Sequence, residues 1–180
     1  MNTFSVASEL RLYLANHWVA VIPSHTIRLF FYRTIMRQQI GPGSSIFLGC
    51  WLDCAGGLVI GKNSTVNQRC RLDSRGGIQI GNSVSISANV TILTSDHDPD
   101  CPRFSGRTAG VIIDDGTFIG TGAIILKGVH IGTGAIVGAG SVVTHDIPPA
   151  EIWAGNPARK IGMRGIDSYD YDASYRRLFQ

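Results

Sequence analysis

The sequence predicts an all-β fold, a parallel β-helix, on the strength of two regularities. From Ile40 onward an aliphatic residue returns every six positions, and a small residue often stands four positions after it. Neither an amphipathic helix nor an ordinary strand has a period of six, whereas the short strands of a parallel β-helix do. We therefore expect both sets of positions to point into one narrow core.

The aliphatic positions are Ile40, Ile46, Leu52, Ile60, Val66, Leu72, Ile80, Ile86, Ile92, Ile113, Ile119, Ile125, Ile131, Val137 and Val143. The small positions are Ser44, Cys50, Ser64, Cys70, Ala123, Ala135 and Ser141. Three hexads make one coil, so roughly six coils at strand spacing predict a prism about 30 Å long.

Residues 1–39 precede the repeats and predict a short N-terminal helical region that caps the prism. Apolar residues run at helical spacing through 4–22, and Ser24 is a candidate N-cap of a second helix. Four arginines against one glutamate give this region a net charge of +3, which leaves zero for the rest. The charge is either a solvated face or part of a weak membrane-surface contact through residues 24–38.

The first coils are 20 residues long, because residues 50–57 and 70–77 match position by position and carry two additional residues. The last residues of these segments, Gly57 and Gly77, lie 20 positions apart, and a further 20 positions reach His97; the period resumes only at Ile113. We therefore expect His97 to stand in register with those two glycines, at an opened corner, with a loop at 98–110.

The β-helix is expected to span residues 40–161. Two prolines follow Val143, and proline cannot continue a strand ladder. Residues 152–161 are therefore expected to form an irregular basic closing segment. Residues 162–180 are a C-terminal tail, for which a short helix and disorder both remain open.

Composition excludes several classes. No basic stripe of the nucleic-acid-binding type is present, and no apolar run approaches the roughly 18 residues of a membrane span. The N-terminus lacks the features of a signal peptide, and four cysteines form neither a CxxC pair nor a zinc spacing. The chain is therefore expected in the cytoplasm, or at the inner face of the membrane, with reduced thiols.

Three motifs accompany the repeats: Ser95-Asp-His-Asp98, Gly138-Ala-Gly-Ser-Val-Val-Thr144 and Ala154-Gly-Asn-Pro-Ala-Arg159. With the repeats, from about Ile40 to Ile161, they resemble the hexapeptide-repeat acyltransferases, nearest to the maltose and galactoside O-acetyltransferases and the colanic-acid-type exopolysaccharide acetyltransferases. The resemblance implies a left-handed β-helix and a homotrimer with an acetyl-CoA site in each groove between neighbouring prisms. It also implies O-acetylation of a sugar hydroxyl, of a small or lipid-linked exopolysaccharide or surface-glycan precursor.

The resemblance assigns roles residue by residue. His97 matches the catalytic histidine, a suitable general base because an unperturbed imidazole is mostly neutral at pH 7. Asn67 matches an asparagine that binds the acceptor. The positions expected to contact acetyl-CoA are Phe118, Thr121, Ala139, Thr144, Gly155, Arg159 and Lys160. Three positions depart from the family pattern: Phe118 replaces a tryptophan, His145 a lysine and Arg75 an acceptor-binding aspartate.

Other chemistries fit less well. Asp96, Asp98, Asp100 and Cys101 have irregular spacing for a metal site, and we expect none. A zinc site of the γ-class carbonic anhydrase type needs three histidines, and the candidates here fall at different phases of the repeat. N-acetylation of an amino sugar, acetylation of a xenobiotic and a non-catalytic solenoid scaffold remain as alternatives.

Overall fold

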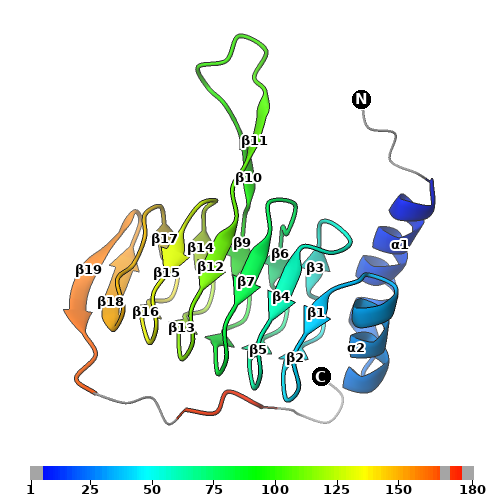
Figure 1. The fold of residues 1–180 in the computed structure, drawn as a ribbon, viewed down its shortest axis with the longest axis horizontal. Coiled ribbons are helices and arrows are strands. Elements are labelled where there is room, and N and C mark those ends of the chain that lie inside the picture. Colours follow the sequence, from blue (N-terminus) through cyan, green and yellow to red (C-terminus); the bar gives the residue numbers. More distant parts are fainter. Residues whose placement is uncertain (1–5, 167–170, 176–180) are drawn as a thin grey trace.

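The computed structural model describes residues 6–166 and 171–175 of the chain. They form a three-sided prism of parallel strands, with two short helices at one end (Figure 1). The parallel β-helix with an N-terminal helical region is therefore confirmed.

Each strand is hydrogen-bonded to the strand one coil away, so each side of the prism is a sheet. The first sheet contains β1 (Gln39–Ile40), β4 (Leu58–Ile60), β7 (Ile78–Ile80), β12 (Val111–Ile113) and β15 (His130–Ile131). The second contains β2 (Ser45–Ile46), β5 (Thr65–Val66), β8 (Ser85–Ile86), β13 (Phe118–Ile119), β16 (Ile136–Val137), β18 (Glu151–Gly155) and β19 (Ala158–Met163). The third contains β3 (Trp51–Leu52), β6 (Arg71–Leu72), β9 (Thr91–Ile92), β14 (Ile124–Ile125) and β17 (Val142–Val143).

The core contains both sets of positions that the period predicts, together with other apolar residues such as Leu58, Ile78 and Val111. All fifteen aliphatic positions are buried, and even Ile40, in the first coil, is only 9% exposed. All seven small positions are buried as well. Burial of an aliphatic side chain stabilises the fold by about 1.5–3 kcal/mol, so the repeated positions are a large source of stability.

The N-terminal helices α1 (Val6–His17), η1 (Val19–Val21) and α2 (His25–Thr34) cover the first coil. Asn16 closes the exposed ladder of the third sheet, because its side-chain amide donates to the Leu52 carbonyl and accepts from the Leu52 N–H, both at 2.9 Å. The Gln38 side-chain amide likewise donates to the Cys54 carbonyl and accepts from the Leu58 N–H, both at 3.1 Å. The amide side chains thus replace a missing preceding coil and satisfy backbone groups that would otherwise remain unpaired.

Two details of the helical region differ from expectation. Ser24 stands at the N-cap position of α2, but its side chain makes no capping hydrogen bond. Arg28 is fully buried and donates to the carbonyls of Ile22 and Ile46, so it cannot face a membrane as the membrane-contact hypothesis supposed. Burial lowers its pKa. No helix among the described residues is long and apolar enough to cross a bilayer.

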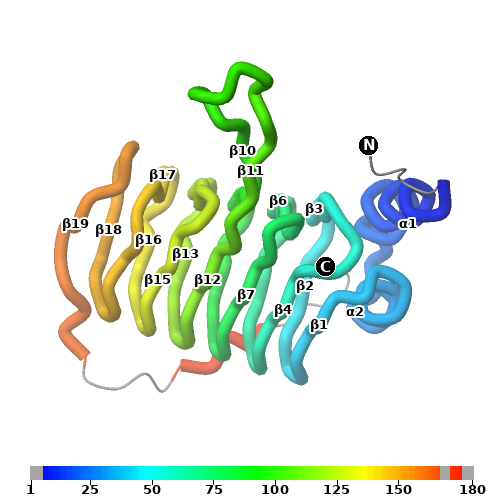
Figure 2. Tube along the Cα trace, turned by 45° about the horizontal axis from the view of Figure 1, so that its top comes forward, coloured from blue at the N-terminus to red at the C-terminus, as the bar shows by residue number. Residues whose placement is uncertain are grey.

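At His97 the coil is interrupted by an antiparallel hairpin, the arm, made of β10 (Ser95–His97) and β11 (Gly106–Thr108). It projects away from the prism (Figures 1 and 2). The expected register is wrong here: Val111 pairs with Ile78, which sets Gly110, and not His97, beside Gly77. The coil closes across the base of the arm, where the Ala109 N–H donates to the Thr94 carbonyl at 2.9 Å.

The closing end is more regular than expected. Ile147 still forms a parallel bridge with Ile131, and β18 pairs in parallel with β16, so the coil continues past the prolines. β18 then turns back into β19 as an antiparallel hairpin, in place of the irregular segment expected at 152–161. The prolines are compatible with this arrangement because they lie at the corner between the two pairings, outside the ladder.

Residues 171–175 of the C-terminal tail lie alongside the prism (Figures 1 and 2). Residues 171–175 form neither helix nor strand and lie against the second sheet, where the Thr65 hydroxyl donates to the Ala173 carbonyl at 2.6 Å. Of the two expectations for this tail, the helix does not hold for residues 171–175. Residues 167–170 and 176–180 lie outside the described part of the chain.

Candidate active site

His97 lies on β10 with its ring held from two sides. Its Nδ1 atom is 2.8 Å from the Phe104 carbonyl oxygen, and its ring stacks on that of Phe104 with centroids 4.7 Å apart and planes inclined by 4°. A carbonyl oxygen only accepts, so Nδ1 carries a proton, and in the neutral form of the ring Nε2 presents the lone pair. Among the described residues, no side chain or carbonyl forms a hydrogen bond with Nε2.

The two strands of the arm are also joined by ionic contacts. Arg107 on β11 binds the Asp96 carboxylate through two nitrogens, both at 3.0 Å, and reaches Asp98 at 3.4 Å. Lys127, on the next coil of the prism, lies 3.5 Å from Asp96. These carboxylates therefore fix the arm and do not orient His97.

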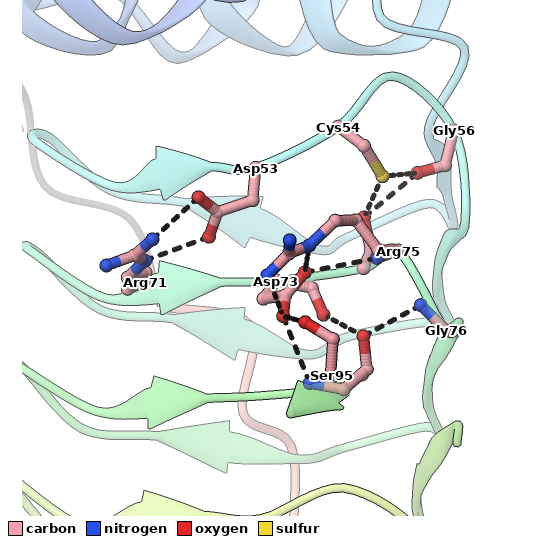
Figure 3. A network of polar contacts seen from close by, with 10 residues as sticks. Asp53, Cys54, Gly56, Arg71, Asp73, Arg75, Gly76 and Ser95 are labelled. Carbon is pink, nitrogen blue, oxygen red and sulfur yellow. Dashed lines mark hydrogen bonds and ion pairs between the residues drawn. The ribbon is translucent and has the colours of Figure 1, made fainter. Parts of the chain in front are cut away.

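The base of the arm rests on Asp73, whose side chain is fully buried. Asp73 accepts hydrogen bonds from Arg75 Nε at 2.7 Å, Arg75 Nη2 at 3.0 Å and the Ser95 hydroxyl at 2.8 Å (Figure 3). Burial alone would raise the pKa of Asp73, but these bonds and those from the backbone N–H groups of Arg75 and Thr94 outweigh it and lower the pKa to about 2. Asp73 thus couples β10, which carries His97, to the second coil.

A hollow of about 390 Å³ opens beside the histidine. It is lined by Arg75, Ser95, Asp96, His97, Gly106, Arg107 and Thr108. The hollow therefore joins the His97 imidazole to polar and charged groups from both the arm and the prism.

A second group of predicted residues follows the edge between the second and third sheets, here called the Asn67 edge. The pairings Ile119↔Val137 and Val137↔Trp153 place Thr121, Ala139 and Gly155 in one column, each two residues past its paired residue. The N–H groups of Thr121 and Ala139 donate to no acceptor in the described chain. This column thus offers exposed backbone donors of the kind that a thioester or pantetheine amide requires.

Asn67 lies on the same edge, directly after β5. Its side-chain oxygen accepts a bond from the Gln68 N–H at 2.8 Å. Gly120 leaves no room for a side chain at the column, because a Cβ there would lie 2.5 Å from the Ala139 nitrogen. Close stacking of successive coils therefore requires glycine at position 120.

His97 lies on a different edge, the one between the third and first sheets, here called the His97 edge. Thr144 lies on the same edge, after β17, with its hydroxyl 2.8 Å from Nδ1 of His145. One chain therefore does not bring His97 to Asn67 or to the Thr121 column, because the third sheet separates the two edges.

The remaining predicted positions are on or near the second sheet. Phe118 is 39% exposed on β13. Lys160 is paired with Glu151 at 2.6 Å, whereas Arg159 bonds only the Ala158 carbonyl among the described residues. Arg159 is therefore the freer of the two cations for a phosphate.

Sequence reasoning missed Asp73, Ser95, Phe104 and Arg107. Asp73 left a signal, because it lies 20 residues after Asp53 in the matched segments. The other three could not be found, since their roles depend on the hairpin pairing. No group of three or more metal-ligating side chains gathers in the described ranges.

The family model described as "Bacterial transferase hexapeptide (six repeats)" matches residues 110–145, and "Hexapeptide repeat of succinyl-transferase" matches residues 57–94. The serine acetyltransferase of Salmonella typhimurium is 30% identical over 177 residues, covering 94% of this chain. The chain spans 56% of that relative's length.

Two solved acetyltransferase structures are similar to this chain. A maltose O-acetyltransferase from Clostridium difficile 630 is 29% identical, with a TM-score of 0.71 over 86% of this chain and 83% of that one. A galactoside acetyltransferase in complex with coenzyme A is 25% identical, with a TM-score of 0.73 over 91% of this chain and 84% of that one.

Proposed function

Because the chain belongs to the hexapeptide-repeat family of transferases, we propose that it is an acetyl-CoA-dependent O-acetyltransferase with His97 as general base. The observation that carries the proposal is the bond between His97 Nδ1 and the Phe104 carbonyl. It leaves the lone pair on Nε2, the arrangement that a general base needs, and the ring borders a solvent-facing hollow.

The residues act in a direct transfer. Acetyl-CoA, when bound, supplies the acetyl group as a thioester. Nε2 of His97 takes the proton of the acceptor hydroxyl as that oxygen bonds to the acetyl carbon, and returns it to the sulfur whose bond to carbon breaks. The free N–H groups of Thr121 and Ala139 are the donors available for the thioester oxygen or the pantetheine arm, with Phe118, Thr144, Gly155, Arg159 and Lys160 as further contacts.

The separation of the two edges supports a homotrimer as part of the proposal. His97 and the Asn67 edge cannot meet within one prism, so a complete site needs the His97 edge of one chain beside the Asn67 edge of another. Closed cyclic symmetry repeats such a groove between each pair of neighbours. Asn67 would then bind the acceptor across the interface.

For the acceptor we propose a sugar, of an exopolysaccharide or surface-glycan precursor. Two solved relatives carry maltose and galactoside in their names, whereas the curated relative carries serine, which makes serine a second candidate. N-acetylation of an amino sugar or of a xenobiotic is a further alternative. A panel of these acceptors, with product masses, distinguishes them.

We propose that the protein works in the cytoplasm, with the inner face of the membrane as the alternative location. Because Arg28 is buried, the proposed surface contact involves fewer residues than 24–38. It rests on Ile27, Phe30 and Ile35, which are exposed, and on Arg37. Sedimentation with anionic vesicles checks it: no difference between the wild type and Phe30→Ser would remove this contact.

The test of the function is substitution of the base. We expect His97→Gln to lower kcat for acetyl transfer by about 10²- to 10⁴-fold, the usual contribution of a general base. His130→Gln is the matched control, because His130 binds Asp114 on the surface, outside the hollow. Activity of His97→Gln within tenfold of the wild type, with an unchanged melting temperature, would overturn the assignment.

A further inference from the structure

A second hollow lies next to the one that contains His97, and Arg75 lines both. It has a volume of about 430 Å³ and lies between α1 and the corner of the first two coils. Its polar lining includes Arg11 and Glu9 from α1 and Asp53, Arg71 and Arg75 from the prism. The three arginines come from separate elements, so the fold, and not a charge run in the sequence, gathers them.

Two of these arginines are held in fixed orientations. Arg71 binds Asp53 through Nε and Nη2, at 2.9 and 2.8 Å, and Arg75 binds Asp73 through the same two nitrogens (Figure 3). In both, the third nitrogen, Nη1, makes no bond to a described residue. Each side chain is 53% exposed. The carboxylates therefore position two guanidinium groups and leave donors of each unused.

Arg11 is different, because no carboxylate in the described part of the chain binds it. Its Nε is buried without a hydrogen-bond partner, and its Nη2 makes only a 3.4 Å contact with the Ser8 hydroxyl. A buried unpaired donor on a cation destabilises the fold, because the donor has lost its bonds to water without a replacement. An incomplete donor set of this kind indicates an acceptor that the chain itself does not supply.

The charges decide which acceptor fits. Asp53 and Asp73 are each engaged by an arginine, and the remaining carboxylate, Glu9, is exposed. The unused groups of the hollow are thus mostly N–H donors on cations, the groups that bind phosphate and carboxylate oxygens best.

We propose that Arg11, Arg71 and Arg75 form a subsite for an anionic group of the acceptor, so that the substrate is a sugar bearing a phosphate or a carboxylate. Arg75 borders both hollows, so the anion lies in one while the hydroxyl lies near His97 in the other. This inference rests on the proposed acetyl transfer, and it accounts for an arginine at a position where the resemblance implies an aspartate.

Binding in the absence of acetyl-CoA tests the subsite separately from the reaction. Calorimetry with glucose 1-phosphate, glucuronate, glucose and serine should show binding of one or both acidic sugars, weakened by added salt, and at least tenfold weaker binding of glucose. Arg11→Gln should weaken binding of the acidic sugar at least tenfold without breaking an ion pair. Arg71→Gln should also weaken binding of the acidic sugar at least tenfold. The double variant Asp53→Asn/Arg71→Gln should have the same effect, and it leaves no carboxylate without its arginine partner.

Arg37→Gln, an exposed arginine of the cap outside the hollow, is the control and should bind like the wild type. Comparison of glucose 1-phosphate with glucuronate shows whether the subsite binds a phosphate or a carboxylate. The subsite would be overturned if glucose and both acidic sugars bound equally well, or if serine alone bound. It would also be overturned if the Arg11 and Arg71 variants bound the acidic sugars as well as Arg37→Gln does. Acidic sugars that bind but are never acetylated, with no saturable binding of CoA, would instead overturn the proposed function and leave the subsite standing.

Discussion

At the scale of single residues, the arm depends on one buried charge. Asp73 is fully buried, yet it is matched by Arg75, by the Ser95 hydroxyl and by two backbone N–H groups. Burial of a carboxylate costs several kcal/mol unless such partners compensate it, so the arrangement stabilises the fold only when complete. The partner of the His97 ring is uncharged, since Nδ1 faces the backbone carbonyl of Phe104.

Asp73 should make the free energy of unfolding depend on pH in the acid range. Its pKa is about 2 in the folded protein, whereas an aspartate in an unfolded chain titrates near 3.9. Between these values the unfolded chain binds a proton that the folded chain does not. The contribution of Asp73, at most about 2.6 kcal/mol, is therefore present above pH 4 and is lost as the pH falls to 2.

Urea unfolding of the wild type and Asp73→Asn at pH 7, 4 and 2.5 measures this contribution. The variant should be less stable at pH 7, and its difference from the wild type should shrink as the pH falls. Asp100→Asn, an exposed arm residue, serves as the control. Parallel losses of stability in wild type and Asp73→Asn between pH 4 and 2.5 would contradict the assignment.

At the scale of elements, the arm is an addition to a coil that is already closed. The bond from Ala109 N–H to the Thr94 carbonyl and the pairing of Val111 with Ile78 restore the coil at its base. The residues of β11 are all exposed, and those of β10 are exposed or half-buried. The prism therefore positions the arm, whereas the arm contributes little to the prism.

Replacement of residues 96–107 by Asn-Gly, a favoured two-residue hairpin, should test this division. It retains Ser95 and its bond to Asp73. We expect the free energy of unfolding to change by about 1 kcal/mol or less, as for other exposed segments, while acetyl transfer is lost. His97→Gln in the intact arm provides the comparison for activity. A loss of stability above about 3 kcal/mol would show that the arm supports the prism.

At the scale of the whole molecule, the two rows of predicted site residues lie on different edges of one prism. The column of Thr121, Ala139 and Gly155 runs along the Asn67 edge, and His97 and Thr144 lie along the His97 edge. In the trimer proposed above, each groove therefore takes its base from one chain and its column from the next.

Mixed trimers should reveal this division of labour. His97→Gln and Asn67→Ala are each expected to be weakly active alone. When the two are co-expressed in equal amounts, random assembly gives about one groove in four with both native residues, so up to about a quarter of the wild-type activity should return. Co-expression of two differently tagged His97→Gln chains is the control. Recovery no greater than the mean of the two parents would show that the site does not cross chains.

The sequence by itself determined the period and hence the core, because a six-residue repeat is a local property and each hexad carries its own aliphatic and small positions. All fifteen aliphatic positions are buried for this reason. It also singled out His97, since the interruption of the repeat is visible in the sequence alone.

Only the tertiary structure decided where the interruption goes. Ser95 pairs with Thr108, 13 residues away, so a count of 20 past Gly77 places His97 in the wrong register. Strand pairing after the prolines, the partners of Asp73 and the separation of Asn67 from His97 likewise depend on contacts between coils. Such contacts join residues distant in sequence, and a local repeat carries no record of them.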